Sequence, residues 1–193
     1  MSFETTLPEI LKAEGGYVND PADSGGETYR GISRRANPDW PGWVLLDAAK
    51  RAGLRAREAL DAHFQADQVM FDLVADLYRR KYYLPVARFR APERATDKMF
   101  DAGVNIGPGG AVRLAQGLVG AKADGAIGPK TLALAGEYFK RPGAVEVFLA
   151  DFRQAQAAFY RDIAARKPGR AKFLSGWLRR AAWLPKDERQ VTA

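Results

Sequence analysis

The 193-residue sequence contains no cysteine and a single histidine, His63. Without cysteine, the chain can form no disulfide framework, no thiolate zinc site and no cysteine nucleophile. One histidine is too few for a histidine-rich metal site, and no G-x-S-x-G motif accompanies it to indicate a serine hydrolase. Thiol chemistry and histidine-based metal centres are therefore excluded.

Long hydrophobic runs are also missing. No stretch approaches the roughly 18 consecutive apolar residues that a membrane span requires. The first ten residues, MSFETTLPEI, lack the basic start and apolar run of a Sec signal peptide. We therefore expect a protein that is made in the cytoplasm, has no membrane span and needs another delivery route if it acts outside.

The positive charge is unevenly distributed. Residues 1–94 carry 14 Lys/Arg and 14 Asp/Glu, whereas residues 95–193 carry 16 and 9, so the whole net charge of +7 lies in the second half. Such a basic half suits an anionic polymer, either nucleic acid or a bacterial wall with its carboxylates and phosphates. An ordinary solvated surface explains the charge equally well, and no nucleic-acid-binding motif accompanies it.

Apolar residues recur mainly at helical spacing, which predicts a mainly α fold with at most a small β-hairpin near residues 27–33. We expect the first helix to begin at Thr6 with a capping box and to end before Gly15. Further helices are expected over residues 69–84, 92–102, 111–119, from 129 onward, over 145–163 and over 174–181.

Glu14 stands at the end of the apolar stripe of the first helix, immediately before Gly15 and Gly16. An apolar face and the negative end of a helix dipole favour the protonated form of a carboxyl group, which can then act as a general acid. The two glycines leave room for a bulky substrate. The alternative is a surface glutamate at a frayed helix end.

The loop that follows supplies three more carboxylates, Asp20, Asp23 and Glu27. Glycoside hydrolysis needs two carboxyl groups in contrasting surroundings, an acid for the leaving oxygen and a carboxylate for water or the anomeric centre. Asp20 and Asp23 also suit turns, since Asn-Asp-Pro and Asp-Ser-Gly-Gly are good turn formers. Their spacing does not fit an EF-hand.

The stretch from Glu14 to Ile32 contains EGGY (14–17), NDP (19–21), Gly25-Gly26, Thr28 and Gly31-Ile32. Together these motifs resemble the signature of glycoside hydrolase family 108, lysozyme-like N-acetylmuramidases of the phage endolysin and secretion activator type. Glu14 and Asp23 have eight residues between them, as in phage-type lysozymes. Four residues separate Asp23 from Thr28, one fewer than in that pattern.

The second half resembles the type 3 peptidoglycan-binding segment that follows the catalytic region in this family. YRRKYY (78–83) resembles the end of the catalytic region, and FDAGVNIGPGG (100–110), DGAIGPKT (124–131) and SGWLRR (175–180) resemble the binding segment. We accordingly expect a catalytic lobe over residues 1–94 and a basic helical lobe over residues 95–193. The two would pack into one compact, lysozyme-like unit.

The resemblance implies a muramidase that cleaves the β-1,4 bond between N-acetylmuramic acid and N-acetylglucosamine, with no metal and no cofactor. Glu14 would be the general acid, and Asp23 with Thr28 would position water or stabilise positive charge; Asp20 is the alternative carboxylate. The expected partner is bacterial peptidoglycan, and the expected state is a monomer that reaches the periplasm or cell wall through a holin or another export route. Expected substrate-binding residues are Tyr17, Tyr29 and Asn105, and expected loop-shaping residues are Gly15, Gly16, Asp20, Gly25 and Gly26.

Two other functions are also compatible with the sequence. A lytic transglycosylase would use one glutamate without a second carboxylate, and a non-catalytic wall-binding secretion accessory could keep the same fold. The separation of the two carboxyl groups decides the stereochemistry, about 5–5.5 Å for retention and about 6.5–9.5 Å for inversion.

Overall fold

The computed structural model describes residues 3–19 and 26–186, and it confirms the mainly α fold. Contacts divide the chain into two compact units, one formed by residues 7–80 and the other by residues 81–186 with residues 3–6. The predicted boundary after residue 94 stays a prediction. Asp20, Asp23 and Gly25 lie outside the described residues.

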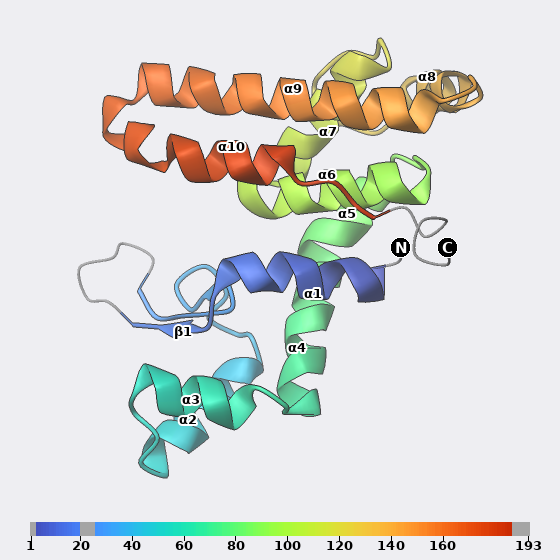
Figure 1. The fold of residues 1–193 in the computed structure, drawn as a ribbon. Helices are drawn as coiled ribbons and strands as arrows, with labels where there is room; N and C mark the ends of the chain where they lie inside the picture. The colour runs from blue at the N-terminus through green and yellow to red at the C-terminus, as the bar shows by residue number, and fades with distance from the viewer. Residues whose placement is uncertain (1–2, 20–25, 187–193) are drawn as a thin grey trace. The chain divides into compact units, whose positions relative to one another are not determined.

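The unit of residues 7–80 combines helices with a small sheet (Figure 1). Its strands form an antiparallel sheet in the order β1-β2-β3, with Tyr17 opposite Tyr29 and Tyr29 opposite Ile32. The predicted hairpin is thus present, and β1 adds a third strand to it. The elements are α1 (Phe3–Glu14), β1 (Tyr17–Val18), β2 (Thr28–Tyr29), β3 (Ile32–Ser33), α2 (Gly42–Arg51), α3 (Arg57–Phe64) and α4 (Gln68–Tyr78).

Aromatic side chains fill the centre of this unit. Trp40 and Trp43 are 6% and 2% exposed, and their indole nitrogens donate to the backbone oxygens of Leu73 and Asn37. Tyr29 stacks on Trp40, and the two ring centroids lie 6.3 Å apart. These rings anchor the loop after β3 to α4, and α2 also contacts α4.

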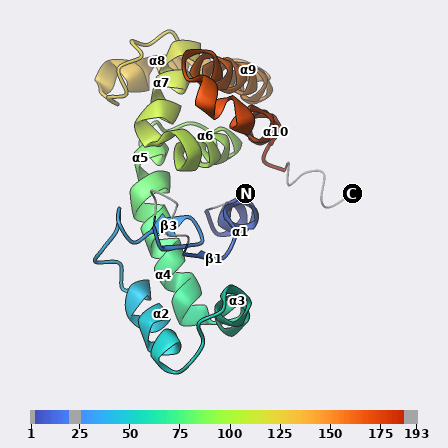
Figure 2. The ribbon, with the colours of Figure 1, turned by 90° about the vertical axis from the view of Figure 1, so that its left-hand side faces the viewer.

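The second unit consists of helices. A π-helix (Arg79–Tyr83) leads from α4 into α5, and the long helix α9 runs beside α10 (Figures 1 and 2). Its elements are α5 (Leu84–Ala87), α6 (Glu93–Ile106), α7 (Pro108–Leu118), α8 (Pro129–Phe139), α9 (Ala144–Arg166), the 3-10 helix η2 (Pro168–Phe173) and α10 (Leu174–Ala182).

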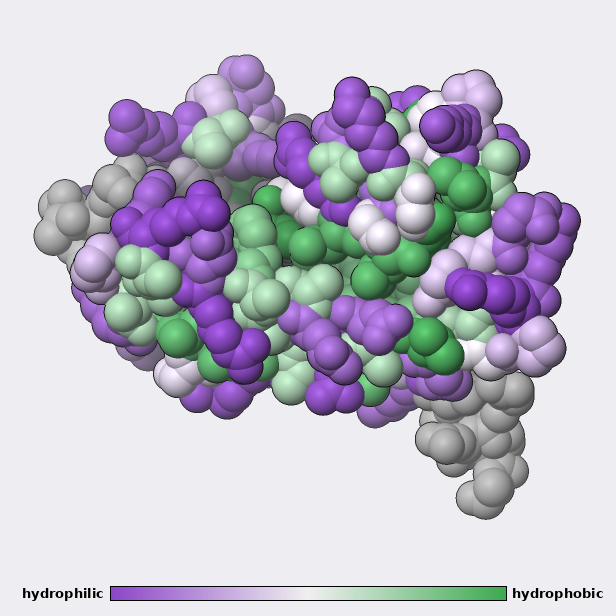
Figure 3. Space-filling view, turned by 90° about the horizontal axis from the view of Figure 1, so that it is seen from above, coloured by the Kyte–Doolittle hydropathy of each residue, from purple (hydrophilic) through white to green (hydrophobic). Residues whose placement is uncertain are grey.

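Apolar side chains form the core of the second unit and also reach its surface. Phe100, Phe148 and Phe152 are fully buried, whereas Val147 and Phe173 are 52% and 50% exposed. The face shown in Figure 3 carries a band of hydrophobic residues bordered by hydrophilic side chains. No helix within residues 3–19 and 26–186 is long and apolar enough to cross a membrane.

Helix boundaries depart from the sequence expectation in two places. The first helix begins at Phe3 rather than at Thr6. Phe3 is 3% exposed and packs against the rings of Tyr83 and Phe100, so tertiary contacts extend the helix beyond its capping box. The helix expected over residues 92–102 continues to Ile106, where Gly107 ends it with φ +80°.

Candidate active site

Glu14 is the last residue of α1, and its side chain is partly buried. The carboxylate lies over the β2–β3 turn: its Oε2 atom is 2.9 Å from the point that a Cβ atom on Gly31 would occupy. Gly31 has φ +77° and no side chain, so the Glu14 carboxylate can occupy the space that a side chain at this position would fill. The position of Glu14 therefore depends on a glycine 17 residues further along the chain.

Tyr78 converges on the same point from α4. Its hydroxyl oxygen lies 2.6 Å from the Cβ position of Gly31, and it donates a hydrogen bond of 2.8 Å to the backbone oxygen of Arg30. The side chain is only 1% exposed. The sequence does not by itself predict Tyr78 as a site residue; the YRRKYY segment, which Tyr78 opens, is the one signal that points toward it.

The turn that carries Gly31 is a tight two-residue hairpin. Arg30 and Gly31 both have positive φ angles, +43° and +77°, a combination typical of a type I′ turn, which matches the twist of the flanking strands. The Arg30 N–H donates to the backbone oxygen of Gly16 at 3.1 Å, which ties the turn to the end of α1. The hairpin and the helix end are therefore held as one assembly.

The two glycines after Glu14 have different structural roles. Gly15 has φ +75°, the left-handed conformation that commonly ends an α-helix. A Cβ atom on Gly16 would collide with the carboxylate of Asp61, and that carboxylate accepts a 2.7 Å hydrogen bond from the Tyr17 N–H. The hydrogen bond that the Tyr17 N–H donates to Asp61 in α3 thus fixes the direction of the chain after Glu14.

Glu27, one of the three loop carboxylates, is held in an ion-pair cluster. It binds the Lys50 amino group at 2.6 Å and the Arg34 guanidinium at 2.7 Å, and it accepts a 2.9 Å hydrogen bond from the Tyr17 hydroxyl. Burial raises the pKa of Glu27, but the hydrogen bonds from Lys50 and Tyr17 outweigh it, so the net shift of the pKa is downward. Glu27 is therefore an ionised structural residue.

Asp47 completes this cluster. Arg34 donates to both of its carboxylate oxygens, at 2.7 and 3.0 Å, and Lys50 lies 2.8 Å away. The hydrogen bonds from Arg34 lower the pKa of Asp47 to about 2, with a further contribution from Lys50.

We expect this cluster to make the stability of the protein fall steeply in acid. Because the folded-state pKa of Asp47 is lowered, its contribution is fully present above the unfolded-state pKa of about 3.9 and is lost as the pH falls toward 2. The midpoint of thermal unfolding, followed by circular dichroism from pH 6 to pH 2, measures this loss.

Asp47→Asn is the matched variant for this experiment. It should unfold at a lower temperature than the wild type at pH 6 and should lose less stability between pH 4 and pH 2. An unchanged acid dependence in the variant would show that Asp47 does not carry the effect.

The remaining predicted site residues lie as follows. Thr28, on β2, donates from its hydroxyl to the backbone oxygen of Gly26 at 3.2 Å. Tyr17 and Tyr29 are 5% and 1% exposed, so their rings pack within the unit. Asn105 belongs to α6 of the second unit. Gly26 has φ +63°, which suits its predicted part in shaping the loop.

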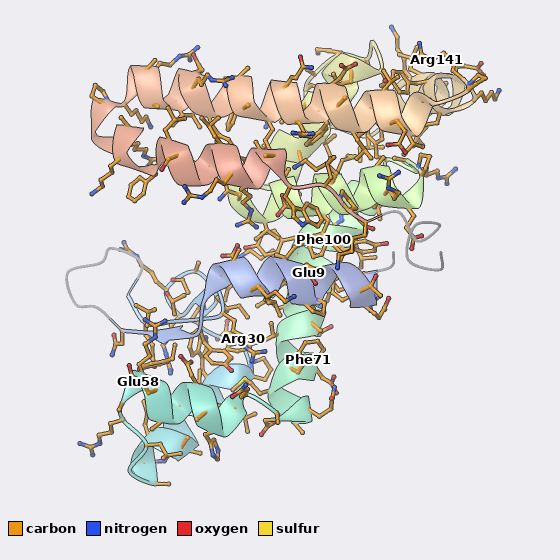
Figure 4. The ribbon with its side chains drawn as sticks, viewed as in Figure 1. Glu9, Arg30, Glu58, Phe71, Phe100 and Arg141 are labelled. Carbon is orange, nitrogen blue, oxygen red and sulfur yellow. The ribbon has the colours of Figure 1, made fainter. Side chains whose placement is uncertain are left out.

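A cavity of about 650 Å³ opens beside the Gly15–Gly16 end of α1. Arg30 from the β2–β3 turn, Glu58 from α3 and Phe71 from α4 contribute to its walls (Figure 4). It therefore combines charged groups of both signs with an aromatic ring, and polar groups in such a pocket can orient a ligand. No cluster of His, Asp and Glu within the described ranges 3–19 and 26–186 could hold a metal ion.

Comparisons with known proteins agree with the motifs in the sequence. Residues 7–107 match the family model described as Glycosyl hydrolase 108, and residues 110–182 match the model described as Predicted Peptidoglycan domain. Among solved structures, the chain is similar to SagA of Brucella abortus, with a TM-score of 0.58, 24% sequence identity and 97% of each chain covered. No curated protein matches the chain.

Proposed function

Because the chain belongs to the glycosyl hydrolase 108 family and is thus a glycoside hydrolase that acts on peptidoglycan, we propose that it is a lysozyme-type N-acetylmuramidase. It would cleave the β-1,4 bond between N-acetylmuramic acid and N-acetylglucosamine. The observation that carries the proposal is the place of the Glu14 carboxylate at the end of α1, where its Oε2 atom and the Tyr78 hydroxyl lie 2.9 and 2.6 Å from the Cβ position of Gly31.

In the proposed reaction, Glu14 donates its proton to the glycosidic oxygen as the bond to the anomeric carbon breaks. A second carboxylate then stabilises the positive charge on the sugar or directs the attacking water. Asp23, with Asp20 as the alternative, is the candidate, and Thr28 would assist it. The water supplies a hydroxyl group to the anomeric carbon. Its remaining proton goes to Glu14, which restores the acid, or to the second carboxylate where that carboxylate directs the water as a base; Glu14 then regains its proton from solvent.

The loop carboxylate Glu27 is not a candidate for this second role. Its charge is matched by Lys50 and Arg34, which lie 2.6 and 2.7 Å away, so it has little negative charge to offer a cationic centre. The second carboxylate is accordingly sought at Asp23 or Asp20.

The surplus of basic residues after residue 94 supports binding to an anionic wall. We propose that peptidoglycan is the polymer this half holds, that the chain acts as a monomer and that it reaches the wall through a holin or another export route. An endolysin role in lysis from within fits these properties.

Digestion of purified peptidoglycan tests the proposed bond specificity. A muramidase releases new reducing ends on N-acetylmuramic acid, and mass spectrometry should find muropeptides that carry one added water per cleaved bond. Products with a 1,6-anhydro ring, lighter by one water, would instead identify a lytic transglycosylase. Wall binding with no released reducing ends would identify a non-catalytic accessory protein.

A further inference from the structure

An exposed amide in the second unit is held in one orientation by two buried side chains. Asn105 lies on the surface near the end of α6. Its Oδ1 atom accepts a 2.7 Å hydrogen bond from the hydroxyl of Tyr160, and that hydroxyl accepts a 3.0 Å bond from the amide nitrogen of Gln156. Tyr160 and Gln156 are 1% and 0% exposed, so the chain of hydrogen bonds starts in the core.

The direction of these hydrogen bonds decides which end of the Asn105 amide faces outward. Burial raises the pKa of Tyr160, although Gln156 and Arg180 oppose the shift, so the phenol keeps its proton and donates a hydrogen bond to Asn105. The carbonyl end of Asn105 is thereby occupied. Its NH2 group, which has no hydrogen-bond partner among residues 3–19 and 26–186, is left as an exposed donor.

A row of aromatic rings begins at Tyr160, the residue that holds this amide. Trp177, on α10, stacks on Tyr160 with ring centroids 5.4 Å apart and an angle of 26° between the planes. Phe173 follows at 6.0 Å from Trp177 and is 50% exposed. Tyr160 thus links a fixed polar group to a row of aromatic rings, and small-ligand sites combine groups of these two kinds.

Hydrogen bonds join α6, which carries Asn105, to α10, which carries Trp177. Asp101, one helical turn before Asn105, accepts a 3.1 Å hydrogen bond from Arg180 on α10. The buried amino group of Lys98 donates to the backbone oxygens of Arg180 and Ala181, at 3.4 and 3.1 Å. The amide and the aromatic rings are therefore presented on helices whose relative position is fixed, which suits specific binding.

We propose that Asn105, Trp177 and Phe173 form a binding site for an N-acetylated amino sugar of the glycan strand. The NH2 group of Asn105 would donate to the acetamido carbonyl, and the aromatic rings would take the apolar face of the pyranose. Tyr160 and Gln156 are positioning residues. The proposal rests on the substrate class of the proposed function and is independent of its catalytic step.

A neutral acetamido group suits this site better than a carboxylate of the peptide stem. Asn105 offers an uncharged donor, and the positive charge of Arg180 on α10 is matched by Asp101. The stacked aromatic rings add an apolar surface, which a sugar face fits and a charged stem peptide does not.

Nuclear magnetic resonance on the full chain tests this site directly. A tetramer of N-acetylglucosamine is titrated into the Glu14→Gln protein, so that the ligand is not consumed, and the side-chain amide signal of Asn105 and the indole signal of Trp177 are followed. Both signals should shift and saturate together. The deacetylated tetramer of glucosamine should bind at least three- to tenfold more weakly, the loss expected for one hydrogen bond.

Asn105→Asp removes the donor and keeps the acceptor for Tyr160, so the fold should persist. The variant should weaken binding of the acetylated tetramer by about three- to tenfold, measured at the Trp177 indole. Gln154→Glu, which places the same added charge on an exposed position of α9, is the control and should bind like the parent protein.

Tyr160→Phe tests the positioning role. It keeps the ring that stacks on Trp177 and releases the amide of Asn105, so the preference for the acetylated over the deacetylated tetramer should fall toward one. A merely structural role would lower the melting temperature and leave that preference unchanged.

Three results would overturn the inference: no shift at Asn105, equal affinity for both tetramers, or a response of Asn105 to stem peptides alone. Failure of this inference can be told apart from failure of the proposed function. Acetyl-dependent binding at Asn105 without release of reducing ends would contradict the muramidase proposal and still support this binding site.

Discussion

Glu14→Gln is expected to abolish lysis of purified peptidoglycan, with kcat reduced by about 10²–10⁴-fold, the usual contribution of a general acid. The amide has nearly the shape of the carboxylic acid and fits the space over Gly31, but it has no acidic proton for the leaving oxygen. Release of reducing ends from wall material, for wild type and variant side by side, measures the effect.

Glu9→Gln is the matched control for this variant. Glu9 lies on the same helix, is labelled in Figure 4, and forms a surface ion pair with Lys12 at 2.9 Å. The same change of charge there should leave lysis within about twofold of wild type, as surface ion pairs contribute little. Substantial lysis by Glu14→Gln, with an unchanged melting temperature, would remove Glu14 from the proposed role.

Gly31→Ala is expected to lower kcat by about a hundredfold without removing any polar group. The new methyl group would lie 2.9 Å from the Glu14 carboxylate and 2.6 Å from the Tyr78 hydroxyl, so at least one of them has to move. Displacement of a catalytic group by about 1 Å costs on the order of a hundredfold in rate. Steady-state rates on soluble muropeptide oligomers measure kcat and KM separately.

A variant at a second glycine distinguishes the effect of backbone strain from the effect of displacing Glu14. Gly120 has φ +76°, almost the same as Gly31, but a Cβ atom there meets nothing within 4 Å. Gly120→Ala should therefore lower the melting temperature through the left-handed strain of about 1–2 kcal/mol alone and leave kcat unchanged. Equal losses of kcat in both variants would show that strain, and not the position of Glu14, explains the result.

The periodic parts of the fold could be read from the sequence. The helix expected over residues 145–163 is α9, Ala144–Arg166, and Pro129 begins α8 as its fixed φ angle predicts. Such elements follow from local spacing and end residues. The π-helix Arg79–Tyr83 could not be predicted, because no local signal separates it from the α-helical pattern on either side.

The candidate site could be predicted from the sequence only in part. The position of Glu14 before two glycines is a local feature, and the structure keeps it at the end of α1. Its neighbours Gly31 and Tyr78 are separated from it in the sequence, and only the folded chain brings them to one point. Glu27 shows the same limit, since its neutralising partner Lys50 is 23 residues away.

The sheet at the site contains strands of two residues each, too short to be stable without support. Its rigidity is supplied by side chains on three helices: Lys50 on α2, Asp61 on α3 and Tyr78 on α4. A screen of random variants for lost lysis should therefore return folded but inactive proteins altered in α2, α3 and α4. The tolerance of this enzyme to mutation is set by those helices as much as by the loop that carries its carboxylates.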